Sequence, residues 1–545
     1  MKAHTLRVYF FTVLFFSVFA VPGMNEDVGN YLNPDVYAAD SWANNDTVTT
    51  KLGDVKGDEG NNTTWVWKAI PYARPPVGEL RWQAPQDPDA WQEIRQSNEF
   101  CSWCPQTAND NGTSVLKGSE DCLYLNVWRP RSSESDLPVY FWIHGGSNKV
   151  GSADPYVGAP MAGKHDMVVV TINYRLGPLG WFTHPALRDG QASLNSSGNY
   201  ALLDIIKALS WVRDNIGAFG GDPNNVTVAG QSAGGVNNLA LMISPHAKDL
   251  FHRVISQSGE VDPQSHAEGD TYANSVIEAL LVQDGTPADR AEDEREVMST
   301  TEISAYLRSK TAADFFTVTA GLKGNPDVFN DGAVIPVEGA EAFDDPATYH
   351  QVPIIIGTTA EEGKLFMYLF GMYEFFPNML YQWMGKELTR LTRITGIDSL
   401  AYKMSAHDTQ PGVYSYIFEY GRYRRSGYNA WPTDTGPSDT MSWAMAVGAS
   451  HGLDVPFNFG SFDSFSFFGS LGERIFREDN RLGWEALSET MMACNARFAL
   501  TGDPNALGLP EWTQWPRRQL ASGPRFMIFD ADDNGEIAHM ARDVR

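Results

Sequence analysis

The stretch NVTVAGQSAGG, residues 225–235, constrains the fold of this chain more than any other feature. Residues 226–229 form a short apolar, β-branched run, which predicts a buried strand. Gly-Gln-Ser-Ala-Gly follows at residues 230–234, and an apolar helical pattern resumes over residues 236–242. A strand, a tight Gly-x-Ser-x-Gly turn and a helix are typical of a nucleophile elbow, which exposes the serine hydroxyl. The sequence therefore predicts an α/β protein with Ser232 as a nucleophile.

The same five-residue pattern recurs at residues 448–452. No β-branched strand precedes this second copy, so we interpret it as accidental. The first copy, at residues 230–234, could instead be a plain turn. The strand before it and the helix after it favour the elbow.

A serine hydroxyl needs a neighbouring base, which a carboxylate orients, before it can act as a nucleophile. After an elbow of this kind the chain order is serine, acid, histidine. Residues 352–357 predict a further buried strand, and only His407, His451 and His539 follow it. His407 lies in a polar loop and His539 in a charged C-terminal tail. Small residues that allow close backbone approach flank His451, so we predict His451 as the base.

The acid is expected just beyond the carboxyl end of a strand, where open α/β sheets place their sites. Glu361 and Glu362 follow the strand at 352–357. Both could instead be charges at a helix N-terminus. An oxyanion hole would use the backbone N–H of Ala233 and those of the Gly-rich loop at residues 144–147.

The first 23 residues predict a secretory signal peptide. Lys2 and Arg7 give a basic start, residues 8–21 are apolar, and small residues follow. The apolar run is too short for most membrane-spanning helices, so a permanent anchor is less favoured. We expect secretion to the periplasm or the extracellular space, where cysteines can oxidise.

No internal repeat and no clear linker divides residues 24–545, so we predict one large globular domain there. Strands expected at 123–128, 139–144 and 167–173 and a helix at 199–216 indicate an open, mostly parallel sheet flanked by helices. The net charge of −26 is unfavourable for binding nucleic acid or anionic membranes. Residues 365–395 are dense in aromatic and aliphatic side chains and form either a pair of core helices or a cap over an apolar pocket.

Several motifs then resemble the type B carboxylesterase/cholinesterase family of the α/β-hydrolase fold. These motifs are AIPYARPPVGELRW at 69–82, SEDCLYLN at 119–126, NYRLG at 173–177, NIGAFGGDP at 215–223 and FALTGDPN at 498–505. They occur in the family's order over most of the chain. The resemblance implies an α/β-hydrolase fold with cap or gorge insertions.

The resemblance also implies site residues. The family's triad corresponds to Ser232, Glu362 and His451. Its oxyanion donors correspond to the N–H groups of Gly146, Ser147 and Ala233. Its first disulfide corresponds to Cys104–Cys122, whereas Cys101 and Cys494 have no family partner, and Ser258 is similar to a serine that supports the acid.

Three departures from the family pattern affect specificity. Gln231 stands where the family usually has Glu, which removes a negative charge near His451. The oxyanion loop continues with Ser147 and Asn148 instead of a small residue and an aromatic one, which makes the pocket wall more polar. The short stretch between Cys104 and Cys122 lacks the choline-binding tryptophan near Gly112, so a cholinesterase is not expected.

The resulting hypothesis is a secreted serine carboxylic-ester hydrolase that acts on small to medium uncharged esters without a metal or an organic cofactor. One alternative is a non-catalytic adhesion or binding protein on the same fold. The other is a lipase at an oil–water interface, suggested by residues 365–395. The sequence leaves the oligomeric state and the natural ester open.

Overall fold

A sheet of eleven strands forms the centre of the computed structural model, which describes residues 42–110, 113–322, 327–424, 429–432, 435–438, 441–462, 471–517, 524–532 and 535–541. The strands are β3 (Asp58–Gly60), β4 (Thr64–Pro71), β8 (Tyr124–Pro130), β9 (Leu137–Ile143), β10 (Val168–Ile172), β11 (Gly221–Gln231), β12 (Arg253–Gln257), β13 (Ile354–Thr359), β14 (Val413–Phe418), β15 (Phe526–Asp532) and β16 (Gly535–Ala541). Their order is β16-β15-β14-β13-β12-β11-β9-β10-β8-β4-β3. All pairs from β10 across to β15 are parallel, and the pairs at both edges are antiparallel. The prediction of an open, mostly parallel sheet is confirmed.

Helices cover both faces of this sheet, as the side chains of β9 show. Val139 and Phe141 belong to the core cluster that includes α3 (Tyr200–Asn215) and α4 (Ala233–Ile243). Tyr140 and Trp142 alternate with them and belong to the cluster that includes α1 (Ala159–His165), α14 (Val455–Phe459) and α16 (Arg481–Thr501). Successive side chains of a strand point to opposite faces, so a strand buried on both faces must be apolar throughout.

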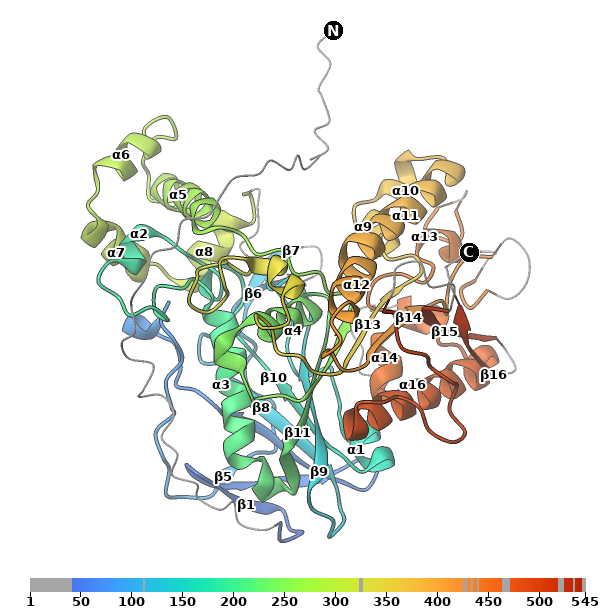
Figure 1. The fold of residues 1–545 in the computed structure, drawn as a ribbon. Coiled ribbons are helices and arrows are strands. Elements are labelled where there is room, and N and C mark those ends of the chain that lie inside the picture. The colour runs from blue at the N-terminus through green and yellow to red at the C-terminus, as the bar shows by residue number, and fades with distance from the viewer. Residues whose placement is uncertain are drawn as a thin grey trace. The chain divides into compact units, whose positions relative to one another are not determined.

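Two groups of helices extend beyond the layers on the sheet. The first, α5 (His266–Gln283), α6 (Ala291–Val297), α7 (Thr300–Ser309) and α8 (Ala312–Thr319), has a small core of its own around Trp82 and Phe315. The second contains α9 (Lys364–Leu369), α10 (Met372–Phe375) and α11 (Asn378–Thr392), and a π-helical turn links it to α12 (Ser399–Ser405). The two groups appear on opposite sides of α4 in Figure 1.

The C-terminal part differs from the sequence-based expectation. The prediction that His539 lies in a charged tail is wrong, because His539 is part of β16, which pairs antiparallel with β15. An edge strand is covered on one side only, so its alternating polar residues hide the strand pattern. The predicted signal peptide, residues 1–23, lies outside the described residues.

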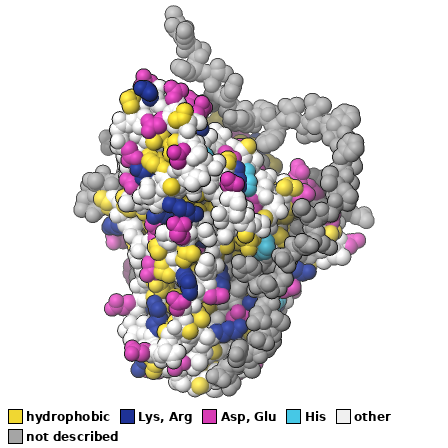
Figure 2. Space-filling view, turned by 90° about the vertical axis from the view of Figure 1, so that its left-hand side faces the viewer, with side chains coloured by type: hydrophobic (Ala, Val, Ile, Leu, Met, Phe, Trp, Pro, Cys, Tyr) yellow, Lys and Arg dark blue, Asp and Glu magenta, His cyan; other side chains and the backbone are white. Residues whose placement is uncertain are grey.

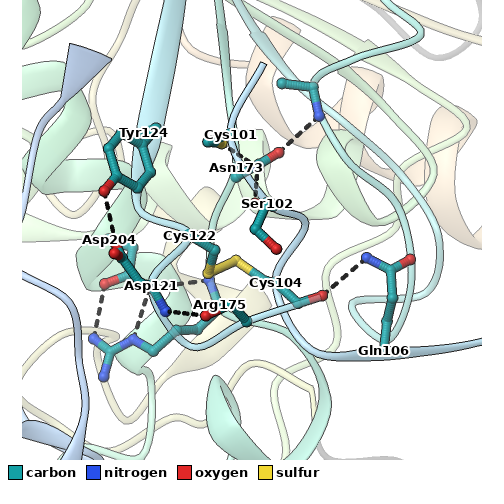
Figure 3. Close-up of a disulfide and its surroundings, with 12 residues drawn as sticks. Cys101, Ser102, Cys104, Gln106, Asp121, Cys122, Tyr124, Asn173, Arg175 and Asp204 are labelled. Atoms are coloured by element: carbon teal, nitrogen blue, oxygen red, sulfur yellow. Dashed lines mark hydrogen bonds and ion pairs between the residues drawn. A yellow bond between two sulfur atoms is a disulfide. The ribbon is translucent and has the colours of Figure 1, made fainter. Parts of the chain in front are cut away.

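A disulfide joins Cys104 to Cys122, as the resemblance implied, with Cα atoms 5.0 Å apart (Figure 3). The side chain of Gln106 donates a hydrogen bond to the Cys104 carbonyl at 3.1 Å. Cys101 and Cys494 are free thiols, and the Asn173 amide donates to the Cys101 sulfur at 3.2 Å. The disulfide thus joins the two ends of the stretch between residues 104 and 122.

The acidic side chains are spread over the surface in view in Figure 2. This view faces the side that carries α5–α8, and Asp and Glu alternate there with Lys, Arg and uncharged residues. Such a mixture is typical of a surface that keeps a protein soluble. None of the described helices combines the length and the apolar composition of a membrane span.

Candidate active site

Ser232 occupies a sharp turn between a strand and a helix. β11 ends at Gln231, α4 begins at Ala233, and Ser232 between them has φ 58° and ψ −124°. This backbone conformation is unfavourable for a residue with a side chain, and such strain is often retained at functional sites. A Cβ atom at Gly234 would overlap the Ile143 carbonyl oxygen. The close approach of β9 therefore explains why this turn requires glycine.

Glu362 and His451 meet in the buried interior, although they are 89 positions apart in the chain. Nδ1 of His451 donates a hydrogen bond to Oε1 of Glu362. The other carboxylate oxygen, Oε2, accepts from the hydroxyls of Thr358 at 2.9 Å, Thr359 at 2.7 Å and Ser258 at 3.2 Å. Burial alone would raise the pKa of Glu362, but His451 and the two threonine hydroxyls lower it to about 2. The carboxylate is therefore ionised at neutral pH and fixes the His451 tautomer.

The structure distinguishes Glu362 from its neighbour Glu361. The Glu361 carboxylate accepts from Nζ of buried Lys364 at 2.6 Å and from the backbone N–H of Ala449 at 3.0 Å. Glu361 thus holds the loop before His451, while Glu362 contacts the imidazole itself. Sequence reasoning missed the two threonines, although they lie in the run TTAEEG directly after the strand.

The second ring nitrogen of His451 contacts Gln231 and not Ser232. The Gln231 amide donates to Nε2 of His451 at 3.0 Å, and within the described residues no hydrogen bond joins the Ser232 hydroxyl to the ring. Burial lowers the pKa of His451, but the Glu362 carboxylate more than offsets this and raises it. Gln231 is the residue before Ser232, so the imidazole lies at the elbow.

The contact predicts a pH effect of the substitution Gln231→Glu. A carboxylate beside Nε2 favours the imidazolium, so the apparent pKa of His451 should rise by about one to two units. His451 must be neutral to act as a base, so activity at pH 6 should fall while activity above the new pKa is retained. The acid limb of the kcat/KM profile measures this pKa. Gln231→Met, which adds no charge, should shift the apparent pKa of His451 less than Gln231→Glu does. If the acid limb of the Gln231→Glu variant lies at the wild-type pH, residue 231 does not contact the His451 ring.

The predicted oxyanion loop crosses directly over the elbow. A Cβ atom at Gly145 would lie 2.6 Å from the Gln231 carbonyl oxygen and 3.1 Å from the Ser232 Cβ. Gly146 and Ser147 follow with φ values of 110° and 56°. Ala233 is the first residue of α4, where backbone N–H groups have no partner within the helix. The loop and the helix start thus approach Ser232 from two sides.

Asn148 does not contribute the polar pocket wall expected from the sequence. Its side chain is 1% exposed, donates to Asp327 at 2.6 Å and accepts from Asn237 at 3.0 Å. Tyr174 donates to the same Asn148 oxygen at 3.4 Å. This buried network ties the loop to α4. Sequence reasoning missed Asp327 and Asn237 because isolated polar residues carry no motif.

Phe366 supplies an apolar wall beside the imidazole. Its ring centroid lies 5.1 Å from that of His451. It belongs to α9, which begins two residues after Glu362. Within the described part of the chain, no group of three or more His, Cys, Asp or Glu side chains is arranged to hold a metal ion.

Comparisons with known proteins identify the family of this chain. The model of the carboxylesterase family matches residues 44–392. The chain is 30% identical to para-nitrobenzyl esterase of Bacillus subtilis (strain 168) over 86% of this chain and 92% of that protein. It is 32% identical to fumonisin B1 esterase of Sphingopyxis macrogoltabida over 86% of this chain and 84% of that protein.

A solved structure shares the fold. The carboxylesterase of Geobacillus stearothermophilus superposes with a TM-score of 0.70 at 28% identity, over 91% of this chain and 98% of that one. The expected α/β-hydrolase fold is confirmed. The chain belongs to the carboxylesterase family and is a carboxylic ester hydrolase.

Proposed function

We propose that this carboxylesterase is a secreted serine hydrolase in which Ser232, His451 and Glu362 form the catalytic triad. The observation that carries the proposal is the buried hydrogen bond between His451 and Glu362, next to the strained turn at Ser232. The positions of all three residues are intact, which argues against a non-catalytic binding protein.

The proposed reaction proceeds through an acyl-enzyme. His451 takes the hydroxyl proton while the Ser232 oxygen attacks the ester carbonyl carbon. The N–H groups of Gly146, Ser147 and Ala233 stabilise the negative oxygen of the tetrahedral intermediate. His451 then protonates the leaving alcohol, and water hydrolyses the acyl-enzyme by the same route.

The resting contact of Gln231 with His451 adds a step before this attack. Nε2 of His451 must exchange the Gln231 amide for the Ser232 hydroxyl before it can accept a proton. Catalytic hydrogen bonds often form only when the substrate is bound. We infer that substrate binding drives this exchange.

Uncharged esters of small to medium size are the proposed substrates. Gln231 is neutral and Phe366 is apolar, so neither of these two neighbours of His451 offers a counter-charge for a cationic ester. The Cys104–Cys122 disulfide supports the proposed secretion, because such bonds persist in oxidising compartments.

Hydrolysis of a p-nitrophenyl ester series from acetate to palmitate tests the function. We expect release of p-nitrophenolate to be fastest with short and medium acyl chains, because the proposed substrates are esters of small to medium size. A protein that is inert toward the whole series would favour the binding-protein alternative.

A further inference from the structure

The outward surface of α9–α11 carries many large apolar side chains. We define this apolar face by Phe366, Phe370, Phe375, Met379, Trp383 and Leu391, all of which are exposed. Phe375, Met379 and Trp383 are 76%, 77% and 59% exposed. Single exposed apolar side chains are common, but a concentration of large ones on consecutive helices is typical of an interaction surface.

α11 exposes more large apolar side chains than is expected for a helix that faces water. Its buried stripe consists of Tyr381, Gly385 and Thr389, spaced four residues apart. The Tyr381 hydroxyl donates to the Ala446 carbonyl at 2.8 Å, which anchors this side. Trp383 and Leu391 point outward. Lys386 and Arg390 are exposed on the same side of the helix. Because a helix normally buries its apolar side, the large apolar side chains among these charges indicate contact with a medium less polar than water.

The apolar face is continuous with the candidate active site. Phe366 is part of the face and also contacts the His451 ring, with 5.1 Å between centroids. α11 alone has 15 residues and is therefore about 22 Å long. The apolar face begins beside His451, and its length exceeds the length of the acyl chain of a small ester.

The charges on this segment favour an uncharged partner. Between residues 366 and 394 the charged residues are Glu374, Lys386, Glu387, Arg390 and Arg393. Arg390 pairs with Glu387, and Arg393 pairs with Asp398 just beyond the segment. The segment is therefore close to neutral in a chain of net charge −26. A second copy of this chain or an anionic membrane would be repelled by that net charge, whereas an uncharged surface would not.

We propose that the apolar face of α9–α11 binds the uncharged surface of aggregated esters, such as an oil droplet, and brings His451 and Ser232 to that surface. This inference rests on the proposed function and extends it to a substrate class. Esters at the droplet surface then reach Ser232 along Phe366, without first dissolving in water.

Flotation of the inactive variant Ser232→Ala with a triolein emulsion coated with phosphatidylcholine tests this binding separately from catalysis. The triple substitution Phe375→Gln, Met379→Gln and Trp383→Gln, added to Ser232→Ala, should weaken adsorption at least roughly tenfold, because three apolar side chains no longer enter the interface. A matched control, Val297→Gln with Leu482→Gln, replaces exposed apolar residues outside the face and should adsorb like the parent.

Two further measurements separate the alternatives. With Ser232 present, the triple variant should hydrolyse soluble p-nitrophenyl acetate at the wild-type rate and retain the wild-type melting temperature. Equal adsorption of parent and triple variant would overturn the proposal. It would also be overturned if sedimentation showed a wild-type dimer that the triple variant converts to a monomer, or if adsorption required an anionic lipid. Absence of ester hydrolysis by the wild type would contradict the proposed function, whereas the flotation result would stand by itself.

Discussion

Replacing Ser232 with alanine is expected to lower kcat for p-nitrophenyl butyrate by roughly five orders of magnitude, because it removes the proposed nucleophile that forms the acyl-enzyme. The elbow would remain folded, since alanine is smaller and the strained backbone is held by the strand before it and the helix after it. Steady-state release of p-nitrophenolate measures the loss.

Ser258→Ala is a suitable control for this experiment. Ser258 donates to the Glu362 carboxylate at 3.2 Å, but two threonine hydroxyls support the same oxygen. Its loss should cost roughly tenfold or less, in line with one neutral hydrogen bond. If Ser232→Ala retained activity within this range, Ser232 would not be the nucleophile.

Glu362→Gln is expected to lower kcat roughly ten-thousandfold. The carboxylate accepts from Nδ1 of His451 and from the hydroxyls of Thr358 and Thr359. An amide has only one oxygen, so one of these donors would face the NH₂ group, and the imidazolium would lose its counter-charge. The decrease should appear in kcat, with a small change in melting temperature.

Glu361→Gln provides the matched control, because the adjacent carboxylate has a different role. It pairs with Lys364, which is buried, and holds the Ala449 backbone. Removal of its charge leaves a buried ammonium group without its ion-pair partner, which is expected to cost about 3 kcal/mol of unfolding free energy. We expect a lower denaturation midpoint and a kcat within tenfold of the wild type. If Glu361→Gln instead lost most of its kcat while Glu362→Gln lost mainly stability, Glu361 would be the acid of the triad.

The sheet could be predicted from the sequence because buried parallel strands are continuous β-branched and aromatic runs. Residues 139–143 and 168–172 are examples, and the elbow follows a third such run. β16 could not be predicted in this way, because an edge strand with Glu536 and His539 shows no such run. What makes it a strand is the pairing with β15, which is a tertiary contact.

The site was predictable only as far as motifs and chain order determine it. The contact between Gln231 and His451 joins residues 220 positions apart and depends on side-chain directions. The same limit applies to residues 365–395, for which the sequence left core helices and a cap equally open. Composition gives the number of apolar side chains but not the side of α11 that packs inward, which Gly385 and Tyr381 determine by fitting closely against the protein.

The measurement that tests the central claim most directly is labelling with a serine-directed organophosphate, followed by intact mass and peptide mapping. The triad predicts one adduct per chain, on the peptide that contains Ser232, with no adduct in Ser232→Ala and slow labelling in His451→Ala. An unlabelled wild-type protein, or an adduct on a different residue, would contradict the assignment of Ser232 as the nucleophile.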